Sequence, residues 1–132
     1  MKHLLLTVSL LCFACGYVWA SEAPNSGVAS WYGEDHRGRL MANGKKFDPD
    51  RLTAASWFYP LGARVRVTTR NRHNQTRSVI VRITDRGPAR ELVNGGRIID
   101  LTHAAFQQLA SPDRGLVAVE VQRVRRSSPA GS

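Results

Sequence analysis

Hydrophobic and polar residues alternate with a period of two along much of the chain, which is the pattern of half-buried β-strands. Four segments show this pattern: residues 27–33, 64–68, 78–85 and 117–122. In the third segment Val79, Val81 and Ile83 share the face that we expect to pack into a core. The polar residues 70–75 separate two of the strands and predict a hairpin turn.

One segment has the features of a helix. Thr102 is a suitable N-cap, residues 103–110 follow it, and Ser111 and Pro112 end it. Residues 97–101 form a short apolar run that predicts a strand just before this helix. Several short strands with one or two short helices favour a compact β-barrel over an α/β sheet. A length of 132 residues fits one domain.

The first twenty residues have the pattern of a secretory signal peptide. A short basic start precedes an uncharged apolar run, residues 4–18, which is too short for a comfortable membrane span. We expect cleavage after Ala20, so that the mature chain begins at Ser21 and has no transmembrane span. Cys12 and Cys15 lie inside this segment, so the mature chain would contain no thiol. The alternative is a lipid attached at Cys15, which would make the protein an outer-membrane lipoprotein.

The sequence predicts a domain bounded by two mobile ends. Residues 21–26 are a small polar lead-in, and residues 125–132 are a basic tail rich in Ser, Pro and Gly. Neither segment has enough apolar surface to offset the entropy of ordering it. We therefore expect the barrel to occupy residues 27–124.

The charge is strongly positive, with 19 Lys and Arg against 10 Asp and Glu. Such a surplus favours an anionic or hydrogen-bond-rich partner. Export to the periplasm or the extracellular space makes a nucleic acid an unexpected partner and a wall polymer a natural one. His36, His73 and His103 are scattered without metal-ligand spacing, and no phosphate-binding loop or nucleophile elbow is present. We expect no metal and no cofactor.

Two aspartates are the first candidates for chemistry. Asp85 ends the strand that carries Val79, Val81 and Ile83, so we expect its side chain to start from the core-facing side, partly withdrawn from water as suits a general acid. The alternative is an aspartate that only hydrogen-bonds the following turn. Asp100 ends the apolar strand before the helix, where a carboxylate also favours a helix N-terminus. Two acids at strand ends of one small barrel would meet if their strands share a groove.

Two aromatic segments offer surface for a sugar. Trp31 and Tyr32 lie in the first strand, and residues 57–59 add three more aromatic side chains. Exposed aromatic rings stack on the apolar faces of sugars, whereas buried rings fill a core, and we expect some of each.

A series of short motifs, in order along residues 27–124, resembles the rare lipoprotein A family of septal-ring lytic transglycosylases. The motifs are GVASWYG at 27–33, ANG at 42–44, LTAA at 52–55, PLG at 60–62, VIV at 79–81, DRGP at 85–88 and RIIDLT at 97–102. The resemblance implies a six-stranded double-psi β-barrel related to the first domain of expansins. It also implies a peptidoglycan glycan strand as the ligand, cleaved without water to leave a 1,6-anhydro-muramic acid end.

The resemblance also assigns roles to residues. Asp85 matches the central catalytic aspartate, Asp100 the second acid shared with expansins, and Ser30 a hydroxyl of the expansin groove. The sequence departs from the family at Met41, Lys45 and Ser56, where Thr, Glu and His are usual. The candidate catalytic residues are therefore Asp85 and Asp100. The candidate substrate-binding residues are Ser30, Trp31, Tyr32, Lys45, Ser56 and Arg86.

Two functions fit these residues. The first is an endolytic transglycosylase in which a single acid protonates the leaving oxygen and later accepts the proton of the attacking C6 hydroxyl, whereas a hydrolase needs two carboxyls. The second is an expansin-like module that binds glycan without cleaving it, which Lys45 and Ser56 favour. In either case we expect a monomer with peptidoglycan glycan strands as its partner.

Overall fold

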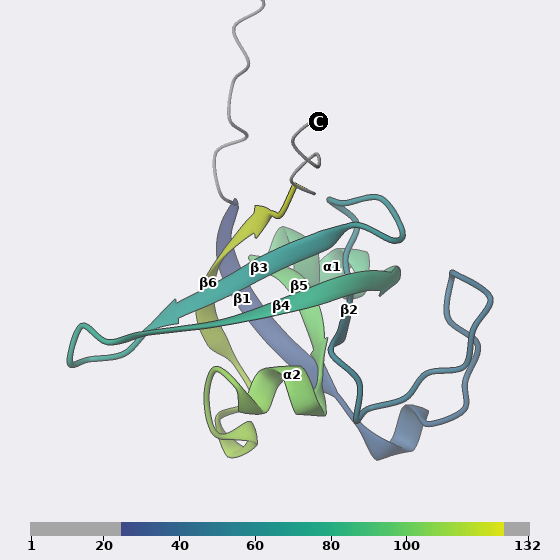
Figure 1. Cartoon of the computed structure of the whole chain (residues 1–132), viewed down its shortest axis with the longest axis horizontal. Coiled ribbons are helices and arrows are strands. Elements are labelled where there is room, and N and C mark those ends of the chain that lie inside the picture. The colour runs from purple at the N-terminus through teal and green to yellow at the C-terminus, as the bar shows by residue number, and fades with distance from the viewer. Residues whose placement is uncertain (1–24, 126–132) are drawn as a thin grey trace, which may run out of the picture.

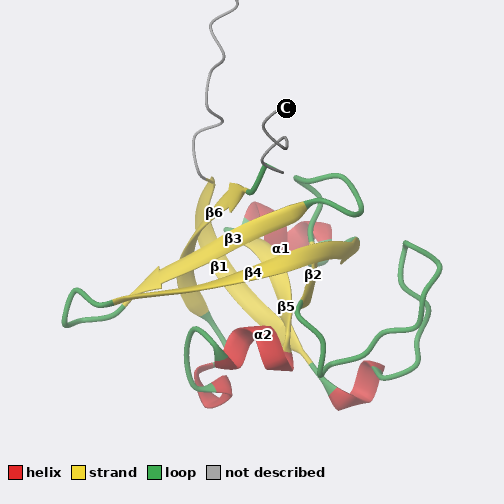
Figure 2. Cartoon of the chain, in the orientation of Figure 1, coloured by secondary structure: helices red, strands yellow, loops and turns green. Residues whose placement is uncertain are grey.

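The computed structural model describes residues 25–125. The predicted signal peptide, most of the lead-in and all of the tail except Arg125 lie outside the described residues. The described chain is a closed barrel of six strands in the order β1-β5-β2-β4-β3-β6 (Figures 1 and 2). The strands are β1 Asn25–Tyr32, β2 Thr53–Ala55, β3 Arg64–Arg70, β4 Thr76–Asp85, β5 Arg97–Thr102 and β6 Val117–Arg123. This confirms the predicted mainly-β, six-stranded barrel.

The helices are short and lie in the connections between strands. They are the α-helices α1 Arg90–Asn94 and α2 His103–Gln107 and the 3₁₀ helices η1 Glu34–His36 and η2 Pro112–Arg114. Thr102 caps α2 as predicted, because its hydroxyl oxygen accepts a hydrogen bond from the Ala105 amide. No helix within residues 25–125 has the length and apolar character needed to cross a bilayer.

The barrel mixes parallel and antiparallel pairs. β1 runs parallel to β5 and β2 parallel to β4, while the other neighbours are antiparallel. β3 and β4 form the predicted hairpin, in register from Arg64 opposite Arg82 to Arg70 opposite Thr76. This arrangement brings residues from distant parts of the sequence onto neighbouring strands, which no single segment of the sequence reveals.

The core lies inside the barrel, where the alternating strands place their apolar side chains. Val65, Val67, Val81 and Ile83 are at most 1% exposed, while the arginines that alternate with the β3 valines are exposed. Phe106 of α2 is also fully buried and closes one end of this core. The period of two in the sequence thus reports correctly which side chains fill the barrel.

The structure differs from the sequence-based boundaries in a few places. β1 begins at Asn25, and Asn25 and Ser26 pair with β6, so these two residues of the expected mobile lead-in belong to the barrel. α2 ends at Gln107 rather than at residue 110. β2 and α1 were not predicted from the pattern, because three and five residues are too short to display a strand or helix period.

Candidate functional site

Two acids and a hydroxyl lie in one row across four adjacent strands. Asp85 of β4 is opposite Ala55 of β2, Ala55 is opposite Asp100 of β5, and Asp100 is opposite Ser30 of β1. Two strand spacings separate the two aspartates, which puts their Cα atoms roughly 10 Å apart. Their sequence neighbours Ile83, Ile99 and Leu101 belong to the core. The structure therefore brings Asp85 and Asp100 to one site, as a shared groove requires.

A register irregularity sets the direction of Asp85. Ala54 is opposite Ile83, but the next residue, Ala55, is opposite Asp85, so Thr84 is an extra residue in β4. A bulge of this kind breaks the period of two and re-aims the side chain that follows it. The expectation that Asp85 shares the core-facing side of Val79, Val81 and Ile83 is therefore wrong, because the bulge moves Asp85 into the row of Asp100.

The two oxygens of Asp85 have different environments. Oδ1 accepts hydrogen bonds from the backbone amides of Ala42, at 2.9 Å, and of Arg86, at 2.8 Å. The Asn43 amide donates to the Thr84 carbonyl at 3.2 Å, so the ANG motif is anchored to the end of β4. Within residues 25–125, Oδ2 has no hydrogen-bond partner. The backbone thus fixes one oxygen and leaves the other available to a ligand.

Asp100 is partly buried in the row. Burial raises the pKa of the Asp100 carboxyl, and the charge of Asp85 adds to the increase, while the hydrogen bond from Ser30 and the charges of Arg97 and His36 oppose it. The Ser30 hydroxyl donates this bond to Oδ1. From the sequence, Asp100 could instead have served as a carboxylate at the N-terminus of the following helix. In the structure Thr102 caps α2, and Asp100 interacts with β1.

The Gly87 turn packs directly against Asp100. A Cβ atom at Gly87 would lie 3.5 Å from Asp100 Oδ2 and 3.2 Å from the Ala55 methyl group. The distance to the Ala55 methyl group is shorter than an ordinary van der Waals contact, so a side chain at Gly87 would push the turn away from Asp100. The glycine of the DRGP motif therefore lets the turn after Asp85 approach Asp100 closely.

Tyr32 and His36 form the wall of the site beside the acids. The Tyr32 ring stacks on Phe47 at 4.2 Å and meets His36 edge-on at 5.5 Å. Within residues 25–125, the Tyr32 hydroxyl and His36 Nδ1 are the buried side-chain polar atoms without a hydrogen-bond partner. Burial, followed by the charges of Asp85 and Asp100, raises the pKa of Tyr32. Unsatisfied buried polar atoms are costly, and they are found where a ligand or water supplies the missing bond.

Replacing Tyr32 with phenylalanine should leave stability unchanged or slightly increased, because the hydroxyl has no protein partner to lose. Tyr59→Phe is the matched control. The Tyr59 hydroxyl accepts from Asn25 at 2.8 Å and donates to the Val121 carbonyl at 3.2 Å, so its removal should cost about 1 kcal/mol. Urea denaturation of the two variants measures this difference. Equal destabilisation would show that Tyr32 is held by a hydrogen bond in the folded protein.

Trp31 points away from the acids. Its indole Nε1 donates to the Pro112 carbonyl at 2.9 Å, and its ring meets His103 edge-on at 4.9 Å and packs against the core. Tyr32, one residue further along β1, is on the other face of the strand. Of the two aromatic residues predicted to bind substrate, the structure brings Tyr32 to the site and uses Trp31 in packing.

The remaining predicted substrate-binding residues have structural partners or, for Lys45, an exposed side chain. Arg86 Nη1 donates to the carbonyls of Ser56 and Tyr59, at 2.8 and 2.6 Å. Ser56 is 0% exposed, and its hydroxyl oxygen accepts from the Phe58 amide. The Lys45 side chain is exposed and forms no hydrogen bond or ion pair within residues 25–125. Neither Lys45 nor Ser56 supplies an acid or an imidazole to the site.

Trp57 is a site candidate that the residue assignment from the sequence missed. It is 41% exposed, and its Nε1 donates to the Pro88 carbonyl at 2.7 Å, which ties the ring to the turn after Asp85. Arg90 lies 4.4 Å from the ring centroid. Phe58, beside it, is 49% exposed. In the sequence, the run of aromatic residues 57–59, one residue after the LTAA motif, was the signal for this site.

Within residues 25–125, no group of three or more His, Cys, Asp or Glu side chains is arranged to hold a metal ion.

Comparisons with known proteins agree with this fold. The family model described as lytic transglycolase matches residues 25–121. The chain is 39% identical over 105 residues to the endolytic peptidoglycan transglycosylase RlpA of Neisseria meningitidis, covering 79% of this chain and 41% of that protein. It is 44% identical over 97 residues to a probable endolytic peptidoglycan transglycosylase RlpA of Synechocystis, covering 72% and 28%. The chain therefore spans less than half the length of these two relatives.

Solved structures show the same fold. The Streptomyces papain inhibitor is 26% identical with a TM-score of 0.58, and the match covers 80% of this chain and 98% of that one. An expansin of Clavibacter michiganensis, solved as a point mutant in complex with cellohexaose, is 20% identical with a TM-score of 0.56, covering 83% and 53%. At that identity the second likeness supports the fold alone.

Proposed function

Because the chain belongs to the family of RlpA-like double-psi β-barrel lytic transglycosylases, we propose that it cleaves peptidoglycan glycan strands endolytically, between MurNAc and GlcNAc, without consuming water. The observation that carries the proposal is the row Asp85–Ala55–Asp100–Ser30 across β4, β2, β5 and β1. It combines an acid with a free oxygen and a second, partly buried acid that a hydroxyl orients.

In the proposed reaction Asp85 Oδ2 carries the proton. This proton passes to the glycosidic oxygen as the bond from that oxygen to C1 of MurNAc breaks. The C6 hydroxyl of the same MurNAc forms the new bond to C1 and returns its proton to Asp85, so the acid is regenerated and the product carries a 1,6-anhydro ring. The carboxylate of Asp100 stabilises the positive charge that develops on the sugar. Exposed Trp57 provides a face on which a neighbouring sugar ring stacks.

The second candidate is a module that binds glycan without cleaving it. It is favoured by the exposed Lys45 and the fully buried Ser56, at the positions where the resemblance implies an acid and an imidazole. The row of Asp85 and Asp100 suits both candidates, because carboxylates also bind sugar hydroxyls and the neighbouring aromatic rings stack on the apolar faces of sugars.

We also propose that the protein acts outside the cytoplasm, in the periplasm or the extracellular space. The signal-peptide pattern of residues 1–20 supports export, and a peptidoglycan substrate fits that location.

Incubating the chain from Ser21 onward with purified glycan strands tests the proposed activity. We expect mass spectrometry to detect fragments with anhydro-muramic acid ends, whose mass is lower by one water than that of hydrolysed ends. Binding to insoluble peptidoglycan, measured in the same preparation by sedimentation, separates the two candidates. Binding without anhydro ends would reject cleavage and support the glycan-binding module.

A further inference from the structure

A second concave site is lined by residues outside the row of the two acids. The β3–β4 turn, the segment around η2 and the start of β6 enclose a pocket of about 420 Å³. It is lined by Thr69, Arg70, Asn71, Arg72, His73, Leu109, Arg114, Val117 and Ala118. The β3–β4 turn, which lines the pocket, lies at the opposite end of β4 from Asp85. The ten residues of β4 span roughly 30 Å (Figure 1). The lining residues include no member of the row of acids, so the two sites have different residues.

The pocket is lined by positive charge without a compensating acid. Arg70, Arg72 and Arg114 contribute guanidinium groups, and no Asp or Glu is among the lining residues. Arg70 donates to Asn74 Oδ1 at 3.1 Å, but Arg72 and Arg114 have no side-chain hydrogen bond or ion pair within residues 25–125. Arg37, by contrast, pairs with Glu34, Asp48 and Asp50. Unpaired guanidinium groups that border a concavity favour an oxyanion as ligand.

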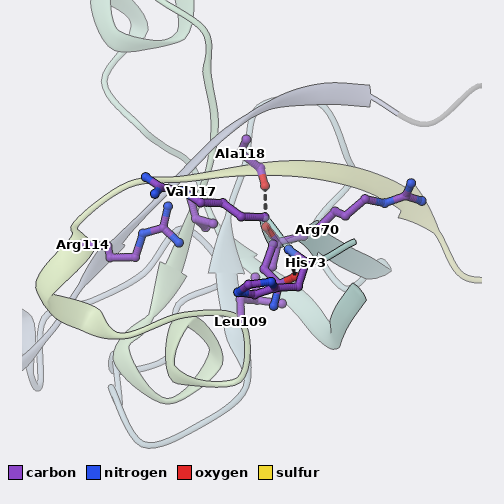
Figure 3. Close-up of a pocket in the computed structure, with 9 residues that line it drawn as sticks. Arg70, His73, Leu109, Arg114, Val117 and Ala118 are labelled. Carbon is purple, nitrogen blue, oxygen red and sulfur yellow. Dashed lines mark hydrogen bonds between the residues drawn. The ribbon is translucent and has the colours of Figure 1, made fainter. Parts of the chain in front are cut away.

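The floor of the pocket is apolar and its walls are held in place. Leu109 and Val117 are each 4% exposed, and Ala118 is exposed beside them. Figure 3 shows Arg114 beside Val117 and His73 beside Leu109. The Thr69 hydroxyl donates to the Ala118 carbonyl at 2.8 Å, which ties β3 to β6 directly at the pocket (Figure 3). An apolar floor with cationic sides matches a ligand that joins an anionic group to a small apolar body.

The β3–β4 turn, which carries Arg72, is itself preorganised. Asn71 Oδ1 accepts from the amides of His73, at 3.0 Å, and Gln75, at 2.9 Å. The Asn71 side-chain amide also donates to Gln75 Oε1 at 2.9 Å. These bonds fix the backbone around Arg72 and His73, so a ligand does not have to order the turn in order to bind.

We propose that this pocket binds the carboxyl-terminal end of a short peptide whose last side chain is small and apolar. The carboxylate lies between the guanidinium groups of Arg72 and Arg114, and the last side chain rests on Leu109, Val117 and Ala118. A free phosphate ion is strongly hydrated and gains nothing from the apolar floor, so it fits this site less well. The pocket volume is at the lower end of the range for small-molecule sites, which suits one or two amino-acid residues.

The proposal goes beyond the proposed cleavage and does not require it. If the proposed function holds, the pocket would engage a peptide while the acids engage the glycan. Failure of peptide binding would leave the chemistry of Asp85 untouched, and failure of cleavage would leave the pocket able to bind its peptide.

Titrating the isotope-labelled chain with N-acetyl-alanyl-alanine, followed by NMR, tests the proposal. We expect saturable shifts of the amides of residues 69–73 and 114–118 with a millimolar Kd. The double variant Arg72→Gln with Arg114→Gln should weaken binding about tenfold, since it removes two charge-assisted contacts. Arg66→Gln is the matched control, because Arg66 is an exposed arginine of β3 that does not line the pocket, and it should change the Kd by less than twofold.

Two further probes complete the test. The C-terminal amide of the same dipeptide lacks the carboxylate and should cause no saturable shift, and inorganic phosphate should bind more weakly than the dipeptide. Absence of saturable shifts with the dipeptide would overturn the proposal. Equal weakening by Arg66→Gln, or phosphate binding as tight as dipeptide binding, would also overturn it, because either result would reduce the pocket to a general attraction of anions.

Discussion

Replacing Asp85 with asparagine should reduce the formation of anhydro ends by roughly 10²–10⁴-fold, the range for loss of a positioned general acid. Asparagine keeps an Oδ1 atom that accepts from the Ala42 and Arg86 amides, so the turn and the ANG loop should stay in place. Its amide nitrogen replaces Oδ2, however, and it has no proton to donate to the glycosidic oxygen. We therefore expect the fold to survive and the chemistry to be lost. Mass spectrometry of the products and thermal melting of the variant measure the two effects separately.

Asp113→Asn is the matched control for this prediction. Asp113 is an exposed aspartate of η2 that does not belong to the row of acids, and its substitution should change activity by less than twofold. A variant at Asp85 that unfolds, with activity falling only in proportion to the folded fraction, would show that this residue serves the turn alone. If the unsubstituted chain has no activity and Asp85→Asn only weakens glycan binding, the glycan-binding module is the better description.

The sequence predicts the structure well in the strands where apolar and polar residues alternate. The valines of β3 and β4 alternate over enough residues to predict the strands, their buried faces and the hairpin between them. The pattern of short strands favoured a compact barrel, but its six-stranded double-psi topology followed from the family resemblance, because no local pattern encodes which strands become neighbours. β2 shows the limit: three residues cannot display a period, yet Ala55 of this strand connects the two acids in register.

The sequence was less informative about where side chains point. A single extra residue at Thr84 changes the face of Asp85, and a bulge of this kind leaves no mark in the alternation before it. The aromatic residues could not be sorted either. Trp31 packs on the core and Trp57 is exposed beside the Gly87–Pro88 turn, although both occur in similar aromatic pairs. Burial of a ring depends on the elements that pack over it, and these come from distant parts of the chain.

Replacing Asp100 with asparagine should lower activity and raise stability at neutral pH, two effects of opposite sign. Burial raises the pKa of Asp100 in the folded protein above its value in the unfolded chain. The folded state therefore disfavours the charged carboxylate. The contribution of Asp100 to the stability of the protein is greatest below the ordinary pKa of an aspartate, and it falls as the pH rises through the pKa of Asp100 in the folded protein. Asparagine stays neutral and still accepts the hydrogen bond from Ser30. It avoids the cost of a buried charge at pH 7, whereas near pH 3 the two proteins should have the same stability.

The loss of activity should be roughly 10²-fold, because the neutral amide no longer stabilises the positive charge that develops on the sugar. Comparing thermal unfolding of the variant and the unsubstituted chain at several pH values cancels the titration of all other groups and isolates Asp100. Ser30→Ala provides the second arm. It removes a hydrogen bond that lowers the pKa of Asp100, so the carboxylate should titrate at higher pH and the fall in stability should move with it. If Asp100→Asn is instead destabilised equally at pH 3 and pH 7, the carboxylate is a structural anchor of β5, and the row of acids loses its second catalytic member.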